Sequence, residues 1–323
     1  MSKKSLTTLY AAIIFSLTSI ILLYPADCLS FALNGLNLWF QKMIPALFPF
    51  MVLSGIMVRM DLTDHFIRIL SPILRPVFRL SNPCLYVIFA GFLCGFPMGA
   101  HVTAQLYTRK QITKNEAQLL LSFCNNIGPV YFISFALPSI GITNKSVPLL
   151  AMYGLPMLYG LVLRHSFYAK SITSTEIVTK ANRKSFAKQL YSCEEFDYRQ
   201  NNQLSFLAAL DESVTSSLTS ITRLGGYMIF FNLLYIIPEL LFPKHIAVYF
   251  NCLLEITGGI IALQNRAPFF ALVMLSFGGF SCLAQTYSII KACNLSIKSY
   301  FFHKTLLTAF SVFFYVVLAK TTS

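Results

Sequence analysis

The sequence is poor in charge. Charged residues make up 11% of its 323 residues, whereas hydrophobic residues make up 56% and the mean hydropathy is +0.64. A soluble domain has about 25% charged residues, so these charges are too few to cover a water-exposed surface, and a soluble enzyme is excluded. The apolar segments are long and do not alternate, which indicates membrane-spanning helices. The sequence therefore predicts an all-α, polytopic helical membrane protein whose main partner is the lipid bilayer.

The sequence also lacks the motifs of enzymes and of metal sites. It contains no Gly-x-Ser-x-Gly elbow, no His-Glu-x-x-His motif and no Walker loop. Its five histidines are dispersed, and its eight cysteines include no Cys-x-x-Cys pair, so neither a zinc site nor a disulfide framework is indicated. We therefore predict that the protein is not an enzyme and that it uses no metal and no cofactor.

Acidic residues are scarce, with 12 against 25 basic residues and a net charge of +13. In a soluble protein this excess would suggest nucleic acid, but in a membrane protein lysine and arginine collect in cytoplasmic loops. We therefore predict no nucleic-acid partner and use the basic segments to place the cytoplasmic side.

Residues 1–30 are predicted to form an N-terminal transmembrane helix. Lys3 and Lys4 precede an uncharged run from Ser5 to Ala26, which places the N-terminus in the cytoplasm. A cleaved signal peptide is the alternative, although no Ala-x-Ala cleavage site closes the run.

Residues 31–164 are predicted to form a first gate-like repeat with a linking span. Arginines alternate with apolar residues over 65–79, a pattern typical of an amphipathic helix in the membrane interface. From Leu80 to Thr108 there is no Lys, Arg, Asp or Glu, yet the middle of this segment is GFPMGA, at 95–100. Because glycine and proline weaken helices and basic residues flank both ends, the segment predicts a re-entrant helical hairpin with an unwound tip.

The rest of the chain is divided by its one clearly hydrophilic stretch. Two spans, over 117–138 and 147–163, are expected before it. Residues 165–205 predict a basic cytoplasmic linker, solvated by default, with contact to anionic lipid as the alternative. Residues 206–320 then predict a second gate-like repeat.

Weak internal similarity supports the two repeats. The segment Gly95 to Ala100 aligns with Gly279 to Ala284, and 48–52 aligns with 225–229 at nearly the same offset. By the charge assignment, the first copy starts outside and the second in the cytoplasm, so the repeats are inverted. Broken helices at membrane depth persist only where protein or a polar cavity covers the exposed backbone, and paired interruptions in two halves point to a midplane site.

Two groups of polar residues are candidates for that site. Glu255 is the only acidic residue in its apolar stretch, where a carboxylate is costly and is paired, protonated or facing a cavity. It is interpreted as a ligand- or proton-binding group, or alternatively as an interfacial residue at a helix end. Asn125 and Asn126 either hold a broken helix together or bind a ligand. The candidate substrate-binding residues are Gly95, Pro97, Gly99, Thr103, Asn125, Asn126, Glu255, Thr257, Gly258, Gly279, Ser281 and Gln285.

The same motifs resemble those of a known family. The ordered set comprises PALFPF (45–50), GFPMGA (95–100), RKxITxxEA (109–117), FCNNxGP (123–129) and LEITGG (254–259). It is similar to sporulation integral membrane proteins of the YlbJ type, within the nucleoside-recognition or Gate domain families. The resemblance covers the chain from about Asn34 to Leu318.

The resemblance implies a multi-pass protein of the bacterial cell membrane linked to spore cortex or envelope formation. It also implies transport or binding of a small polar solute, either nucleoside-like or a cell-wall precursor. The alternative is a non-transporting assembly factor that docks partners through the basic linker. The sequence leaves the oligomeric state, including a homo-oligomer, open.

Overall fold

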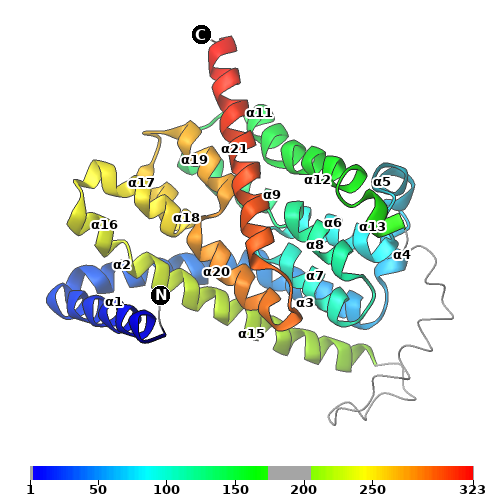
Figure 1. The fold of residues 1–323 in the computed structure, drawn as a ribbon, viewed down its shortest axis with the longest axis horizontal. Coiled ribbons are helices and arrows are strands. Elements are labelled where there is room, and N and C mark those ends of the chain that lie inside the picture. Colours follow the sequence, from blue (N-terminus) through cyan, green and yellow to red (C-terminus); the bar gives the residue numbers. More distant parts are fainter. Residues whose placement is uncertain (1–2, 174–204, 323) are drawn as a thin grey trace.

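The computed structural model describes residues 3–173 and 205–322, and within these ranges every regular element is helical (Figure 1). Six helices are long and apolar enough to cross a bilayer: Ser5–Leu23, Pro25–Arg59, Ser146–His165, Phe206–Leu241, Pro268–Cys293 and Ile297–Lys320. The predicted all-α membrane architecture is confirmed.

Two long helices form one side of the molecule. After α1 (Lys3–Leu23), the helices α2 (Pro25–Leu38) and α3 (Ile44–Arg59) continue one another through the π-helical turn η1 (Trp39–Met43). Helix α15 (Phe206–Leu233), extended by α16 (Ile236–Leu241), packs along α2 and α3 (Figure 1). The Trp39 indole N–H donates to the Ile221 carbonyl at 2.8 Å, which fixes the two helices at this turn.

π-Helical turns accommodate prolines in three helices. The turns η1, η2 (Phe132–Ala136) and η3 (Leu150–Gly154) each end two residues before a proline, at Pro45, Pro138 and Pro156. A proline provides no N–H, and its ring clashes with the carbonyl of the residue four positions before it. In each of the three helices this preceding residue lies inside the wider π turn. The helices therefore continue past these prolines.

The arginine-rich segment folds into two short helices, α4 (Thr63–Ile67) and α5 (Ser71–Phe78). Helix α5 meets α6 (Asn82–Cys94) at an angle of 105°, so the two do not form one straight span. Ile69 and Ile73 are exposed beside the arginines. This amphipathic arrangement is compatible with the predicted interfacial position, which stays a prediction.

The segment Leu80 to Thr108 is broken in the middle. Helix α6 ends at Cys94, residues 95–97 are non-helical, and α7 (Met98–Thr108) follows and packs against α6. Gly95 has φ 82°, a conformation that favours glycine.

The segment expected to span over 117–138 is interrupted at its Asn-Asn and Gly-Pro residues, and it is not among the six candidate spans. Helix α8 (Lys114–Phe123) ends before Cys124, and a helix resumes only with α9 (Pro129–Tyr131), followed by η2 and α10 (Leu137–Ser139). Pro129 supplies no N–H to continue the helix, and the Asn126 side-chain amide takes up the free Phe123 carbonyl instead. The first half then ends with α11 (Ser146–Leu149), η3, α12 (Leu155–His165) and α13 (Ala169–Thr173).

The second half also contains breaks. Helices α17 (Lys244–Leu254) and α18 (Ile256–Leu263) are separated by Glu255 alone and pack against each other. Helices α19 (Pro268–Phe277) and α20 (Gly279–Ile290), with the 3-10 turn η4 (Lys291–Cys293), form one candidate span interrupted at Gly278. Helix α21 (Ile297–Thr322) closes the chain.

The two aligned breaks therefore differ in form. Gly95 lies between helices that pack on each other, whereas Gly279 lies within a single span. The inverted repeats, the re-entrant hairpins and the domain boundaries stay predictions, and residues 174–204 of the predicted linker lie outside the described residues.

Two broken helices of the first half cross at very close range. A Cβ at Gly91 or Gly99 would meet the Cys124 carbonyl oxygen, and one at Gly95 would meet the Gly128 backbone nitrogen. The α6–α7 break therefore packs backbone to backbone on the α8–α9 break, and only glycine permits this approach.

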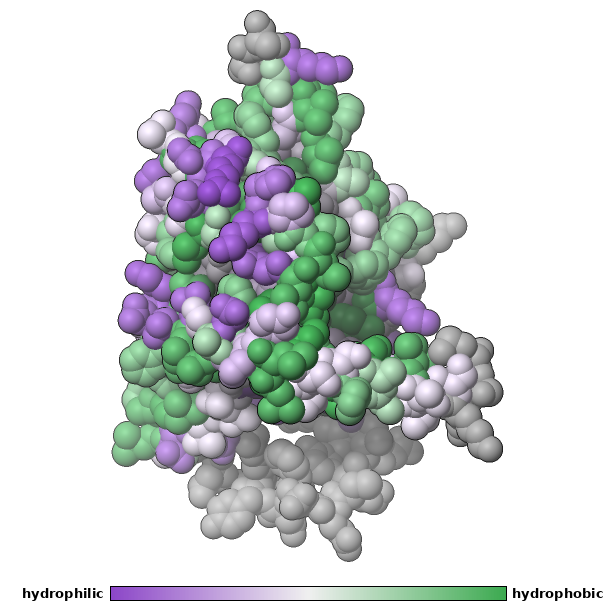
Figure 2. Space-filling view, turned by 90° about the vertical axis from the view of Figure 1, so that its left-hand side faces the viewer, coloured by the Kyte–Doolittle hydropathy of each residue, from purple (hydrophilic) through white to green (hydrophobic). Residues whose placement is uncertain are grey.

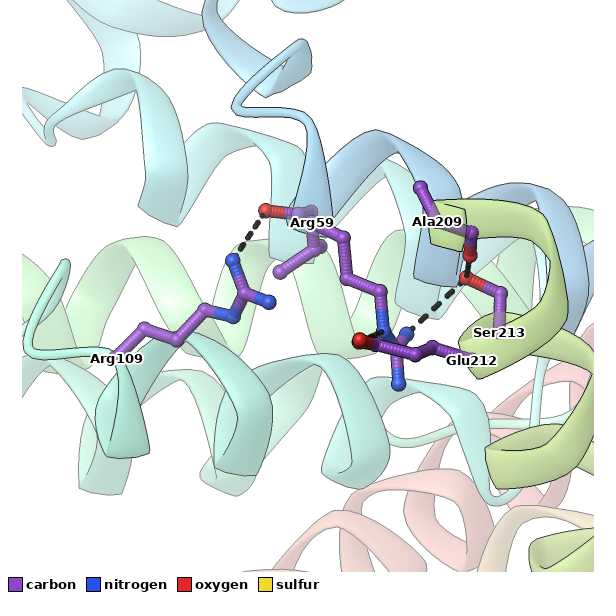
Figure 3. A network of polar contacts seen from close by, with 6 residues as sticks. Arg59, Arg109, Ala209, Glu212 and Ser213 are labelled. Carbon is purple, nitrogen blue, oxygen red and sulfur yellow. Dashed lines mark hydrogen bonds and ion pairs between the residues drawn. The ribbon is translucent and has the colours of Figure 1, made fainter. Parts of the chain in front are cut away.

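A polar network ties three helices together at one end of the molecule (Figure 3). The Arg59 guanidinium lies 3.2 Å from a Glu212 carboxylate oxygen and donates to the Ser213 hydroxyl at 3.2 Å. Arg109 donates to the Val58 carbonyl at 2.9 Å. Because Glu212 is exposed, the ion pair itself contributes little to stability, and the network mainly fixes how α3, α7 and α15 meet.

The outer surface is strongly apolar. Hydrophobic residues cover much of the face in Figure 2, and hydrophilic residues gather in patches toward one side. Large side chains such as Phe15, Leu22 and Phe313 are exposed. Surface of this kind is stable in lipid and not in water, so the protein is an integral membrane protein.

Replacing Gly99 with alanine should destabilise the fold. Its new Cβ would overlap the Cys124 carbonyl oxygen, and overpacking of this kind costs about 1–3 kcal/mol. Gly226→Ala in α15 is the matched control, because a Cβ there meets nothing within 4 Å and alanine favours the helix by up to about 1 kcal/mol. Thermal unfolding in detergent should show a lower midpoint for Gly99→Ala only. Equal midpoints would contradict the close crossing.

Candidate functional site

A small cavity lies where the breaks of both halves meet. Its volume is about 60 Å³. Residues of the first two breaks (Cys94, Phe96, Ile127, Gly128) line it, together with residues near Glu255 and in α20, and its apolar side comes from η1, α3 and α15. Its polar side chains are Tyr131, Glu255, Thr257 and Gln285.

Glu255 caps the broken end of a helix. It adopts an extended conformation between α17 and α18 and is 2% exposed. Its carboxylate accepts the Thr257 N–H at 3.0 Å and the Gly258 N–H at 2.8 Å, and also the Asn232 side-chain N–H at 3.2 Å. A negative charge at a helix N-terminus is stabilised by the free N–H groups and the helix dipole. The three bonds leave part of the carboxylate's accepting capacity for the cavity.

The Tyr131 hydroxyl is buried in the cavity wall. It makes no hydrogen bond of standard geometry with a described group, and its polar neighbour is the Thr257 side chain, which also lines the cavity. Buried polar groups are nearly always satisfied by protein, water or ligand. The cavity therefore presents a hydroxyl whose hydrogen-bonding capacity the fold does not fully use.

Asn125 connects the first half to the last two helices. Its side chain accepts the Ala100 N–H at 3.3 Å and donates to the hydroxyls of Thr286 and Tyr300, each at 3.0 Å. All of its side-chain bonds are made within the protein, which supports the structural interpretation of this residue over the ligand-binding one.

A buried lysine lies beside these amides. Lys304 of α21 is 2% exposed and donates to the Asn125 carbonyl at 2.9 Å and to the Asn126 side-chain oxygen at 3.1 Å. Its ammonium also lies 4.5 Å from the centre of the Phe96 ring, and Phe96 lines the cavity.

The predicted site residues are only partly brought together. Glu255, Thr257 and Gln285 line the cavity, and the Gly258 N–H binds Glu255 at its edge. The other predicted residues pack around it without lining it: Gly95, Pro97, Gly99, Thr103, Asn125, Asn126, Gly279 and Ser281. Among these, Thr103 donates to the Gly99 carbonyl and Ser281 accepts from Gln285. The break residues therefore shape the cavity walls, and the polar contacts come from residues beyond them.

Sequence reasoning missed Tyr131, Asn232 and Lys304. Asn232 carries a usable signal, since it is a lone amide in the apolar run FFNLL (230–234). Lys304 was interpreted as a marker of topology, and its isolation among aromatic residues (YFFHK, 300–304) was the available signal. Tyr131 carries none, because tyrosine is common throughout this chain.

The cavity is small for an organic solute. A water molecule needs about 10–15 Å³ on this measure, so the volume of about 60 Å³ holds a few waters. Ligand pockets commonly enclose about 300–1,000 Å³. The described conformation is therefore closed with respect to a nucleoside-sized molecule.

Comparison with known proteins identifies relatives of the chain. Residues 40–145 match the Gate family, described as nucleoside recognition. The resemblance seen in the motifs is confirmed. The chain is also 26% identical over 347 residues to the sporulation integral membrane protein YlbJ of Bacillus subtilis (strain 168), covering 97% of this chain and 83% of that protein. No solved structure matches the chain significantly. The Gate match includes both breaks of the first half and ends before the segment that contains Glu255.

Replacing Glu255 with glutamine should destabilise the protein. The amide group would direct donor hydrogens at N–H groups that now donate to the carboxylate, and loss of such a cap costs about 0.5–2 kcal/mol. Glu239→Gln makes the same chemical change on the first turn of α16, where no hydrogen bond of the Glu239 side chain is observed, and should have little effect. Thermal unfolding compares the two variants. An unchanged midpoint for Glu255→Gln would refute the capping role.

Proposed function

We propose that the cavity is the closed form of a midplane site through which the protein binds and transports a small polar solute. The observation that carries this proposal is the buried Tyr131 hydroxyl, which makes no hydrogen bond of standard geometry and shares the cavity with Glu255, Thr257 and Gln285. In an apolar membrane protein, a cavity that broken helices line and that contains a few buried polar side chains is the arrangement expected of a transport site.

The roles of the residues follow from their contacts. Tyr131 and Gln285 hydrogen-bond the solute, while Glu255 orients the start of α18 and presents its remaining acceptor capacity to the cavity. The nucleoside-recognition description of the matched family favours a nucleoside-like solute, and a cell-wall precursor is the second class to test. The relation to YlbJ supports a role in sporulation, in the bacterial cell membrane. The lysines before the first apolar run favour a cytoplasmic N-terminus.

Transport of such a solute requires the site to open. Because the crossing at Gly91, Gly95 and Gly99 leaves no space between the first two breaks, these segments move as one body. The cavity would then enlarge on its other side, where η1, α3, α15 and α18 contribute its lining. Motion of one bundle against another around a fixed site is the usual form of alternating access.

Tyr131→Phe should weaken solute binding without lowering stability. Loss of one neutral hydrogen bond corresponds to about a 3- to 10-fold weaker affinity, while the Tyr131 hydroxyl makes no hydrogen bond of standard geometry that the fold would lose. Tyr315→Phe is the matched control, since that buried hydroxyl also makes no such hydrogen bond but does not line the cavity.

The measurement is uptake into proteoliposomes, with nucleosides and nucleotide-linked cell-wall precursors as the panel. Reduced uptake of one solute in Tyr131→Phe, with normal uptake in Tyr315→Phe, is the expected result. Equal uptake by both variants would remove Tyr131 from the site, and no uptake of any panel member by the unmodified protein would count against transport of these two classes.

A further inference from the structure

Lys304 holds its ammonium in a set of groups that suits a cation. The Lys304 Nζ lies 2.9 Å from the Asn125 carbonyl oxygen and 3.1 Å from the Asn126 side-chain oxygen. It also lies over the ring of Phe96, 4.5 Å from the ring centre. Both oxygens are acceptors, and an aromatic face attracts cations. No donor group competes with the ammonium among these contacts.

The position of these oxygens strengthens the attraction. They follow directly after the C-terminus of α8, where free carbonyl groups and the helix dipole create partial negative charge. No carboxylate forms an ion pair with Lys304 in the part of the chain that the structure describes. The positive charge is therefore held by helix-end oxygens and not by a counter-ion.

In membrane transport proteins, unwound carbonyls and half-helix C-terminal ends are the groups that coordinate free monovalent cations. We propose that the broken end of α8 is a monovalent-cation site, and that the Lys304 ammonium occupies it as a cation tethered to the chain. The site is built by one half of the molecule and filled from α21, which packs against α8.

The placement beside the cavity gives this site a consequence for transport. Phe96 lies under the ammonium and also lines the cavity. A free cation that entered and left here would couple its gradient to the solute, whereas a tethered one cannot leave. Resting on the proposed function, this predicts that solute uptake needs no free cation at the α8 end.

Lys304→Ala tests the site directly, because truncation empties it and leaves room for a free ion. The purified full-length variant is unfolded thermally in choline, sodium, potassium, ammonium and methylammonium chloride at equal ionic strength. The ammonium salts should raise its midpoint by about 3 °C or more relative to choline, since a ligand that binds only the folded state stabilises it. The unmodified protein should show no such difference.

Lys304→Met is the matched control, because its long apolar side chain fills the space and excludes an ion. It should be destabilised without rescue by any cation. Each cation's effect on the unfolding midpoint of Lys304→Ala is compared with its effect on the unmodified protein and on Lys304→Met. If no cation raises the Lys304→Ala midpoint more than it raises the other two, the cation site is refuted. Failure of Lys304→Ala to fold in every salt, including purification in ammonium chloride, refutes it as well.

A second measurement separates this inference from the proposed function. The solute is the nucleoside or precursor that the unmodified protein takes up. Uptake of this solute by Lys304→Ala should depend on ammonium, whereas uptake by the unmodified protein should be the same in sodium and in choline. Cation rescue of stability without uptake by any variant would support the site and count against transport. Sodium-dependent uptake by the unmodified protein, without cation rescue of Lys304→Ala, would overturn the tethered cation alone.

Discussion

The structure depends on how unpaired backbone groups are satisfied where helices stop inside an apolar protein. Helices break between Cys94 and Met98, after Phe123 and at Glu255, and the Pro268–Cys293 span is interrupted at Gly278. Each break frees N–H or C=O groups that lipid cannot satisfy. Buried side chains bind several of those groups: Asn126, Tyr235 and Lys304 donate to carbonyl oxygens, and Glu255 accepts from two N–H groups.

Two buried charges serve opposite helix ends. The Glu255 carboxylate accepts from the N–H groups at the start of α18, and the Lys304 ammonium donates to oxygens that follow the end of α8. Each charge complements the local dipole, so neither needs the other as a counter-ion. This arrangement leaves a carboxylate near one wall of the cavity and an ammonium behind another.

Close glycine contacts set the size of the cavity. Backbone-to-backbone packing between the two first-half breaks removes the space that side chains would otherwise keep open. The result is a small cavity that already contains polar groups, with α15, α18 and the helix that contains η1 on its other side. The π turn before Pro45 shows that the helix containing η1 tolerates irregular backbone.

The sequence by itself determined the membrane class, the helical fold and the positions where helices are weak. Low charge and long apolar runs require a bilayer, and glycine and proline at 95–99 and 128–129 act locally, so these features are readable from neighbouring residues. The same local signals identified Glu255. They also indicated a Gly-Pro break inside the span expected over 117–138, and the helix is interrupted there between Phe123 and Pro129.

Only the tertiary structure decided which polar groups share a cavity. The bond from Lys304 to Asn125 joins residues 179 positions apart, and Tyr131 and Glu255, which are distant in sequence, line the same cavity. Such contacts depend on how separate segments cross, which hydropathy and spacing do not encode. A lone lysine marks a membrane boundary or a buried cation equally well until its neighbours are known.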